Sequence, residues 1–460
     1  AYGITTGFGD FAKVAVPEEM SNTLSTNLIL SHCTATGEPY SEEVVRGMLL
    51  LRANALCVGV SGVRPVLVTM MAEMLNKGVV PVVPQKGSLG ASGDLAPLAH
   101  MSLPLLGKGR AYYQGVEMDG GEAMAKAGIQ TLDTLVCKEG LGLTNGTCAM
   151  TSVGTLALYD TICASQLADL IASMSMEALT GLLNAFDERV HAVRGHKGQL
   201  TVAKNFRLLT EGSEILSNCQ QDRVQDAYSL RCTPQVHGAA RDTVEYAASV
   251  AGVELASAID NPCVTLDGRV ESNGNFHGAP LAYVLDFLAI PTADVASISE
   301  RRTDRFLDVA RNRGLPAFLA GDPGVDSGFM IAQYTAAGIV SEMKRNAVPA
   351  SVDSIPSSAM QEDHVSMGWA AARKLRRSIP AFARVLAVEL LCSCRSFDFR
   401  KPYRPGAAGA AVYRVVRQYA NEIGPDVRDT WTTPQIEGVA EAILSGEVLA
   451  AAESAVGALK

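Results

Sequence analysis

Charged residues are scarce in this chain of 460 residues. Asp, Glu, Lys and Arg make up 19% of it, below the roughly 25% of an average soluble protein. The 39 basic and 48 acidic residues leave a formal net charge of −9, and such an acidic chain is a poor general binder of nucleic acid or anionic membranes. The scarcity of charge predicts a large core or a subunit interface, and it favours a small-molecule ligand.

The chain also lacks the spacings of a metal site. Its ten cysteines include no CxxC pair, and no histidine cluster has zinc-like spacing. We therefore expect no bound metal and reduced thiols in a cytoplasmic protein. No apolar run is expected to reach the roughly 18 residues that span a bilayer, because the most apolar stretch, 153–186, is interrupted by Asp160 and Glu177. No membrane segment is expected.

Helical signals dominate what is present. Residues 41–58 begin with a serine N-cap, and 65–78 begin with proline and end with glycine. Residues 79–93 are rich in proline and glycine and should be non-helical, with a new helix near Asp94. From about residue 151 onward the sequence predicts long helices that are apolar on nearly all sides, as in a bundle or an oligomer core.

Strand signals are few and short. The best are 263–266 and 269–271 around an Asp-Gly turn, and a stretch at 111–118. The sequence therefore predicts a mainly α-helical protein with a few short strands.

The most unusual segment is 87–94, Gly-Ser-Leu-Gly-Ala-Ser-Gly-Asp. As a phosphate cradle it fails, because the glycines follow GxxGxxG rather than GxGxxG and no P-loop lysine follows. As a serine-hydrolase elbow it also fails, because GxSxG requires glycine where the chain has Asp94. A tight glycine turn that caps the next helix is the plain structural alternative.

A third interpretation is that Ala91, Ser92 and Gly93 form a self-processing tripeptide. Attack of the Gly93 nitrogen on the Ala91 carbonyl carbon would close a five-membered ring, and loss of the Ser92 hydroxyl as water would leave an exocyclic methylidene. Glycine permits the close approach, alanine leaves its carbonyl unobstructed, and serine carries the leaving group. The product would be an electrophile that no ordinary side chain supplies.

Seven motifs, in order across nearly the whole chain, resemble the histidine and phenylalanine ammonia-lyase family. They are YGITTGFG at 2–9, GSLGASGDLAPLAH at 87–100, KEGLGLTNGT at 138–147, QDAYSLRCTPQ at 225–235, GNFHG at 274–278, SERR at 299–302 and SVDSIPSSAMQEDHVSMG at 351–368. The resemblance implies a long-helix bundle related to the aspartase and fumarase superfamily, a homotetramer, and a 4-methylidene-imidazol-5-one (MIO) group.

The MIO group would form from Ala91, Ser92 and Gly93 without a diffusible cofactor. The resemblance further implies an MIO-bearing N-terminal region at 1–142, followed by the helical bundle and C-terminal helices at 143–460. Because family members carry a segment before the YGxTTGFG motif, the chain, which begins at Ala1, is expected to lack upstream residues.

Substrate choice in the family is tied to the pair that is Ser31 and His32 in this chain. Ser-His resembles histidine ammonia-lyases, since an imidazole needs a polar partner that a phenyl ring would leave unpaired. Glu362 is the second histidine-lyase mark, and the resemblance gives it a catalytic role. By itself, a Ser-His pair at a helix end is more often capping or exposed to solvent.

Three further residues carry over as chemistry-bearing groups. Tyr2 resembles the base that removes the Cβ proton, which requires that its surroundings favour the phenolate, for example through a helix N-terminus and polar partners. Tyr228 resembles a second essential tyrosine, and Arg231 resembles the guanidinium that binds the substrate carboxylate. The structural alternatives are a buried hydrogen-bonded aromatic for Tyr2 and an interface ion pair for Arg231.

Three more residues resemble binding groups. Asn145 and Gln225 are similar to the amides that hold the MIO oxygen and the substrate carboxylate, and Phe276 to an aromatic wall of the pocket. Alone, Asn145 and the glycine after it would predict only a turn, and Phe276 would be core.

The resemblance implies non-oxidative elimination of ammonia from L-histidine to give urocanate. Met343, Met360 and Ala279 depart from the usual histidine-lyase pattern, so a tyrosine or phenylalanine ammonia-lyase or aminomutase stays open. A catalytically silent helical scaffold is the alternative from another class, and it should lack Ser92, Tyr2 or Arg231.

Overall fold

The structure, a computed structural model, describes residues 1–219, 223–421 and 428–460. The chain packs into two compact units. Unit 1 comprises Ala1–Ala157, Ala247–Asp286 and Pro349–Arg376, and unit 2 comprises Leu158–Tyr246, Phe287–Val348 and Arg377–Lys460. The division of the chain into regions 1–142 and 143–460 stays a prediction.

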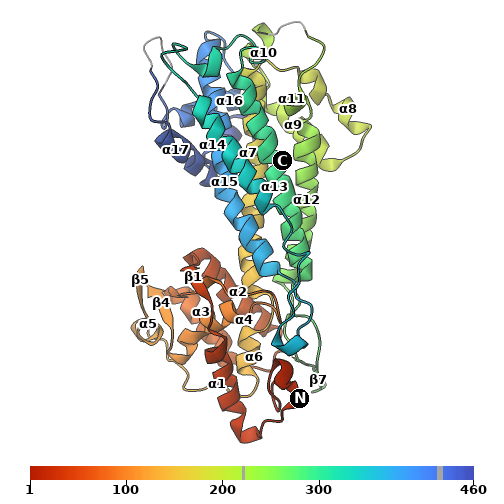
Figure 1. The fold of residues 1–460 in the computed structure, drawn as a ribbon, viewed down its shortest axis with the longest axis vertical. Helices are drawn as coiled ribbons and strands as arrows, with labels where there is room; N and C mark the ends of the chain where they lie inside the picture. Colours follow the sequence, from red (N-terminus) through yellow and green to blue (C-terminus); the bar gives the residue numbers. More distant parts are fainter. Residues whose placement is uncertain (220–222, 422–427) are drawn as a thin grey trace. The chain divides into compact units, whose positions relative to one another are not determined.

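The chain is mainly helical, as predicted (Figure 1). The helices are α1 (Ser21–His32), α2 (Glu42–Cys57), α3 (Pro65–Lys77), α4 (Leu95–Ser102), α5 (Gly120–Lys126), α6 (Glu139–Thr144), α7 (Cys148–Ala178), α8 (Glu188–Ala192), α9 (Lys197–Leu209), α10 (Glu214–Asn218), α11 (Tyr228–Arg231), α12 (Thr233–Leu255), α13 (Ala279–Leu307), α14 (Met330–Asn346), α15 (Gly368–Arg400), α16 (Ala407–Val416), α17 (Thr433–Leu444) and α18 (Glu447–Val456). The strands are β1 (Thr36–Pro39), β2 (Val79–Pro81), β3 (Pro84–Lys86), β4 (Arg110–Tyr113), β5 (Val116–Asp119), β6 (Cys263–Val264) and β7 (Val270–Glu271).

Helix α3 illustrates how local sequence sets the element boundaries. Pro65 occupies its first turn, and Gly78 ends it with φ +74°. Proline is preorganised for a helix start, and glycine adopts the left-handed conformation at little cost. The predicted helices at 41–58 and 65–78 are therefore confirmed to within a residue or two.

The small sheets correct one strand assignment. The stretch at 111–118 is not a single strand but a hairpin of β4 and β5, with β2 pairing on the other edge of β4. Gln114 (φ +52°) and Gly115 (φ +78°) make the turn. The predicted hairpin around the Asp-Gly turn is confirmed as β6 and β7, although both strands are shorter than expected.

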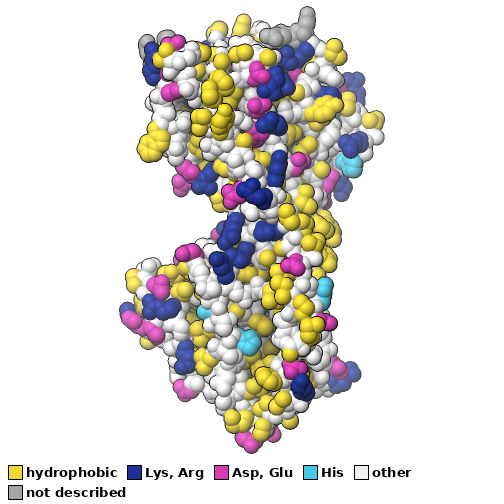
Figure 2. All heavy atoms as spheres, viewed as in Figure 1, with side chains coloured by type: hydrophobic (Ala, Val, Ile, Leu, Met, Phe, Trp, Pro, Cys, Tyr) yellow, Lys and Arg dark blue, Asp and Glu magenta, His cyan; other side chains and the backbone are white. Residues whose placement is uncertain are grey.

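Unit 2 is built around one apolar core. Helices α7, α9, α13, α15 and α16 contribute side chains with no solvent exposure: Leu170, Phe206, Phe306, Leu386 and Val412. This burial explains why the sequence after residue 151 is apolar on nearly all sides of its helices. Hydrophobic side chains are also spread over the visible surface (Figure 2), in keeping with the scarcity of charge.

Helix α13 corrects the expectation about long apolar runs. Ala279–Leu307 contains an 18-residue window with a mean hydropathy of 1.5, which is long and apolar enough to cross a membrane. Of that window, 61% is buried within the protein, and Asp286 in the same helix pairs with Lys374 at 2.7 Å. A core helix of a globular protein has these properties.

Candidate active site

A pocket of about 240 Å³ in unit 1 collects the motifs that carry the predicted chemistry. Its walls come from the end of α1, the loop before α4 with the start of that helix, and the loop at 357–362. The lining residues are Ser31, His32, Thr34, Gly87, Ser88, Leu89, Ala91, Gly93, Leu95, Ala96, Ser357, Ser358 and Glu362. The structure therefore brings His32 and Glu362 to the same pocket as the Ala-Ser-Gly segment.

Backbone hydrogen bonds to Gly90 and Gly146 hold the Ala-Ser-Gly segment and the residue after it. The Gly93 N–H donates to the Gly90 carbonyl at 3.2 Å. The Gly146 N–H donates to the Ser92 carbonyl at 2.9 Å, and the Asp94 N–H donates to the Gly146 carbonyl at 2.9 Å. Ser92 has a φ of +52° and Gly93 a φ of +84°. A left-handed serine is uncommon and costs energy that the surrounding contacts must offset.

The packing at Gly93 fits the residues required for an MIO group. A Cβ atom at this position would lie 2.2 Å from the Gly146 carbonyl oxygen, well inside van der Waals contact. Position 93 therefore accepts only glycine, the residue whose nitrogen must approach the Ala91 carbonyl. Ala91 and Gly93 both line the pocket, so a ring formed here would face the cavity.

Asp94, at the N-cap of α4, is a buried carboxyl that sequence reasoning did not single out. It has no solvent exposure, and its Oδ2 accepts a hydrogen bond from the Met150 N–H at 2.7 Å. Burial raises the pKa of Asp94 to about 7, although the hydrogen bond from Met150 lowers it. The signal that distinguishes Asp94 from the rest of the motif is its burial, which only the structure shows.

His32 ends α1 and lines the pocket with its neighbour. Its Nδ1 lies 3.0 Å from the Ser31 Oγ, and that hydroxyl is 3.2 Å from the Leu28 carbonyl. Burial lowers the pKa of His32, whereas the charge of Glu362 raises it. The net lowering keeps the imidazole neutral near pH 7, so it can both donate and accept a hydrogen bond.

Glu362 is held by two serine hydroxyls. Ser357 Oγ donates to Glu362 Oε2 at 3.0 Å, and Ser358 Oγ donates to the same oxygen at 2.8 Å. The loop reaches this arrangement through three consecutive left-handed residues, Ser358, Ala359 and Met360, with φ of +49°, +52° and +70°. None of them is glycine, so the loop holds backbone strain beside the candidate site.

Tyr2 lies beside the Glu362 loop. Its hydroxyl accepts a hydrogen bond from the Gly9 N–H at 3.1 Å, and a Cβ at Gly9 would lie 3.2 Å from Ser358 Cβ. Burial raises the pKa of Tyr2, the Gly9 bond lowers it, and the charge of Glu362 raises it. The expectation that the surroundings favour the phenolate is therefore wrong for this chain by itself, because burial outweighs the single N–H donor.

Asn145 lies behind the Ala-Ser-Gly segment rather than in the pocket lining. It is buried, and its Nδ2 donates to Asp260 Oδ1 and to the Asn261 carbonyl, each at 3.1 Å. Asp260 also forms a buried ion pair with Lys138. The Ser92 carbonyl oxygen instead accepts from the backbone N–H of Gly146, a group that a side-chain motif does not reveal. Phe276, three residues before the start of α13, is half-buried and is not among the lining residues.

The remaining predicted residues belong to unit 2. Tyr228 and Arg231 occupy the single turn of α11, with the Arg231 guanidinium 4.6 Å from the centre of the Tyr228 ring. Arg231 Nε donates to the Asp226 carbonyl at 2.8 Å, and the Asp226 carboxylate accepts from the Leu182 N–H at 2.6 Å. Gln225 is exposed beside them. The structure therefore groups the predicted residues into two sets, one in each unit.

The three departures from the histidine-lyase pattern lie outside the pocket lining. Met343 is buried in the core of unit 2, Met360 is 67% exposed, and Ala279 begins α13. These three residues leave a tyrosine or phenylalanine enzyme open, but none of them lines the pocket that this chain forms.

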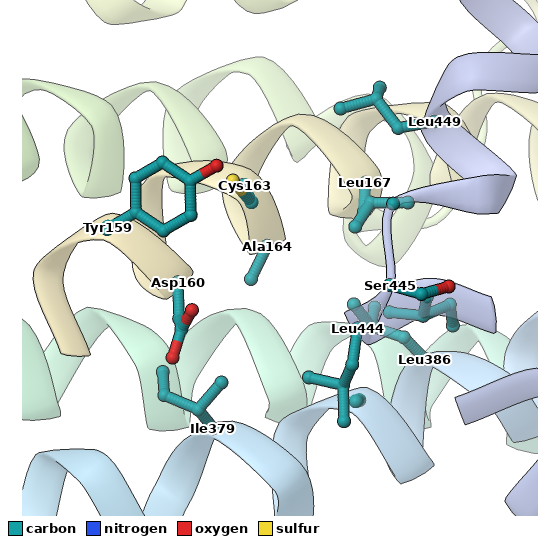
Figure 3. Close-up of a pocket in the computed structure, with 13 residues that line it drawn as sticks. Tyr159, Asp160, Cys163, Ala164, Leu167, Ile379, Leu386, Leu444, Ser445 and Leu449 are labelled. Carbon is teal, nitrogen blue, oxygen red and sulfur yellow. The ribbon is translucent and has the colours of Figure 1, made fainter. Parts of the chain in front are cut away.

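A second pocket, in unit 2, carries none of the predicted residues (Figure 3). Its volume is about 200 Å³, and it lies among α7, α15, α17 and α18. Figure 3 shows Leu167, Leu386, Leu444 and Leu449 around it, with Tyr159 near Cys163 at one side. Its wall is mainly apolar, which is typical of imperfect packing between helices.

Comparison with known proteins shows the family of this chain. Residues 1–418 match the family of aromatic amino acid lyases. A histidine ammonia-lyase of Caldanaerobacter subterraneus subspecies tengcongensis is 52% identical over 448 residues, which cover 97% of this chain and 87% of the relative. Several other bacterial relatives at about 50% identity carry the same name.

Solved structures show the same fold. The histidine ammonia-lyase of Trypanosoma cruzi has a TM-score of 0.90 and 39% identity, covering 99% of this chain and 85% of that one. A tyrosine aminomutase of Streptomyces globisporus has a TM-score of 0.94 and 35% identity, covering 100% and 90%. The chain belongs to the aromatic amino acid lyase family, whose members named here are carbon–nitrogen lyases and aminomutases.

Proposed function

We propose that this protein eliminates ammonia from L-histidine to give urocanate. The observation that carries the proposal is the shared pocket, which His32 and Glu362 line together with Ala91 and Gly93 and to which they bring polar partners for an imidazole. Both side chains are half-buried, and a phenyl ring would offer neither of them the hydrogen bond that an imidazole offers, at a cost of about 1–3 kcal/mol. The relatives named histidine ammonia-lyase support the same substrate.

Each residue then has a defined task in the elimination. The MIO group, formed from Ala91, Ser92 and Gly93, supplies an electrophilic carbon for the substrate amine. Tyr2 accepts the Cβ proton, Arg231 binds the carboxylate, and the C–N bond breaks as the new double bond forms. Tyr228, Gln225, Asn145 and Phe276 complete the site as predicted from the family resemblance. Because the protein would hold these groups in one geometry, they would not need to meet the substrate separately from solution, and the reaction would be faster.

We also propose that the active form is a cytoplasmic homotetramer, in which residues from different subunits complete each site. An apolar groove of about 910 Å³ between α12 and α13 of unit 2 supports this assembly, because Tyr246, Phe287 and Ile290 expose 55%, 44% and 51% of their surface there. All ten cysteines carry free thiols, in keeping with a reducing compartment.

A tyrosine or phenylalanine lyase or aminomutase is the second candidate. The similarity to a tyrosine aminomutase over the whole chain favours it, because such enzymes share the chain fold. A silent scaffold is disfavoured, since Ser92, Tyr2 and Arg231 are all present.

Initial rates with histidine, tyrosine and phenylalanine decide among these functions. We expect urocanate, detected by its ultraviolet absorbance, to form from histidine far faster than the corresponding products from the other two. β-Amino acid formation would indicate an aminomutase, and no turnover in a correctly folded, dehydrated enzyme would favour the scaffold. Light scattering at the assay concentration tests the tetramer, which an active monomer would contradict.

A further inference from the structure

Arg52 is a buried cation directly behind the Ala-Ser-Gly segment. It lies on α2 and has no solvent exposure. Its guanidinium donates to the Gly142 carbonyl at 3.2 Å and to the Asn145 carbonyl at 2.5 Å. Within residues 1–219, 223–421 and 428–460 no carboxylate forms an ion pair with Arg52, and its Nε has no hydrogen-bond partner. The buried Asp94 carboxyl is close enough for the Arg52 charge to lower its pKa, but the direct contacts of the guanidinium are carbonyl oxygens, and a buried charge held in this way is costly to retain.

The bond to Asn145 connects Arg52 to the reacting segment. The Asn145 carbonyl and the Gly146 N–H belong to one peptide group, and that N–H donates to the Ser92 carbonyl oxygen at 2.9 Å. A cation on the oxygen of a peptide draws electron density from its nitrogen, so the N–H becomes a stronger donor. Hydrogen bonds in series strengthen one another in this way.

We propose that Arg52 is a positioning residue for self-processing, which acts on the Ser92 carbonyl through the Asn145–Gly146 peptide. The inference rests on the proposed MIO group and assigns to it a residue outside the pocket. The hydrogen-bond series runs from the Arg52 guanidinium through that peptide to the Ser92 oxygen, in the low-dielectric interior of unit 1.

Two steps are needed, and only the second requires this polarisation. In the first, the Gly93 nitrogen bonds to the Ala91 carbonyl carbon, and the Ala91 oxygen leaves as water with the Gly93 and Ser92 amide protons. In the second, Ser92 loses its Cα proton and its Oγ as a second water, and a double bond forms between Cα and Cβ. Electron density from the Cα–H bond passes to the Ser92 carbonyl oxygen, where a strong donor stabilises the developing negative charge.

The structural alternative is that Arg52 only caps α6. Its two carbonyl partners lie at the C-terminal end of that helix, where cations are favourable. If Arg52 is only a cap, its removal would lower the stability of the fold and leave chains that have lost no water. If its charge polarises the peptide, its removal would stall processing after the chain has lost the first water. The two roles therefore predict different masses.

The test follows the intact mass of newly synthesised chains in a cell-free reaction over time, together with thermal unfolding. Arg52→Gln keeps a neutral donor and Arg52→Lys keeps the charge. Met48→Ala, one turn earlier on α2 and equally buried, serves as the stability control. We expect Arg52→Gln to lose the second water about ten- to a hundredfold more slowly than the wild type, so that a species lacking one water accumulates.

The other variants make the result decisive. Arg52→Lys should process several-fold more slowly than the wild type, and the species that lacks one water should appear as an intermediate. Met48→Ala should process normally despite its lower stability. Wild-type processing rates in Arg52→Gln, or full-mass chains alone in every Arg52 variant, would overturn the proposal. If the wild type itself keeps its full encoded mass, the MIO assignment fails instead, which separates the two hypotheses.

Discussion

The two ends of the pocket are built by different means. At the Ala91–Gly93 end, backbone groups bond to backbone groups, and the contact between Gly93 and Gly146 leaves no room for a side chain. At the His32–Glu362 end, serine hydroxyls hold the polar side chains. The first end is buried around Gly93, whereas the second is partly exposed.

This difference separates chemistry from specificity. Close backbone packing fixes the reacting segment and tolerates no change, because a new atom has nowhere to move. Hydrogen-bonded side chains in a partly exposed loop can be exchanged at the cost of one or two interactions. We therefore expect substitutions at the first end to abolish function and those at the second to adjust it.

The largest effect is expected for Gly93→Ala. The new Cβ would lie 2.2 Å from the Gly146 oxygen in a left-handed conformation, so the segment cannot close the ring. The intact mass should retain both waters and turnover should fall to background. Gly115→Ala is the matched control: it has a similar φ of +78° but nothing within 4 Å, and should cost only about 1 kcal/mol of stability. Normal dehydration of Gly93→Ala would contradict the packing argument.

Tyr2→Phe should have the next largest effect. It keeps the ring and its packing but deletes the hydroxyl, so turnover should fall by at least about a hundredfold while the MIO absorbance and the lost waters stay normal. Loss of the absorbance would make Tyr2 a structural residue, and near-normal turnover would transfer the base role to another group such as Tyr228.

The pH dependence of the wild type sharpens the same prediction. Burial raises the pKa of Tyr2 above its ordinary value of 10, so the phenolate is the minor form near neutrality. If Tyr2 is the base, kcat/KM should rise with pH from about 7 to about 10, by close to tenfold per unit where no other group titrates. A profile without this rise would mean that the assembled site lowers the pKa of Tyr2 or that another group is the base.

The sequence alone predicted much of the fold and part of the site. Caps such as Pro65 and Gly78 determine helix ends through local backbone preferences, which is why those boundaries agree with the structure. The hairpin at 110–119 was missed because its turn contains a left-handed Gln114, a conformation that favours glycine or asparagine. Alternating apolar residues therefore looked like one strand.

The supporting groups could not be found in the same way. Arg52, Asp94 and Asp260 each bond to a residue more than 50 positions away in the chain, and their importance follows from burial. The donor to the Ser92 oxygen is a backbone N–H, which no side-chain pattern encodes. Likewise, the rise in the pKa of Tyr2 comes from desolvation, which depends on packing rather than on motif identity.

At the other end of the pocket, His32→Leu should cost one to two orders of magnitude in kcat/KM for histidine. It removes a hydrogen-bonding partner of the imidazole and leaves the substrate's ring nitrogen unpaired, a loss of about 1–3 kcal/mol. Binding of phenylalanine should weaken much less. Ser31→Ala, which removes only the hydroxyl beside His32 Nδ1, is a milder control. Unaltered histidine kinetics in His32→Leu would refute the histidine assignment while leaving the lyase class intact.

The smallest effect is expected for Ser358→Ala. The variant removes one of the two hydroxyls on Glu362 Oε2, and Ser357 keeps the other at 3.0 Å. A hydrogen bond to a carboxylate contributes about 1.5 kcal/mol at the low end of its range, so kcat/KM for histidine should fall by roughly tenfold with dehydration unchanged. Ala359→Gly tests the loop itself: at φ +52° glycine relieves strain without touching Glu362, so activity should stay near that of the wild type. If Ser358→Ala instead blocked dehydration, the two ends of the pocket would be coupled and the separation of chemistry from specificity would be wrong.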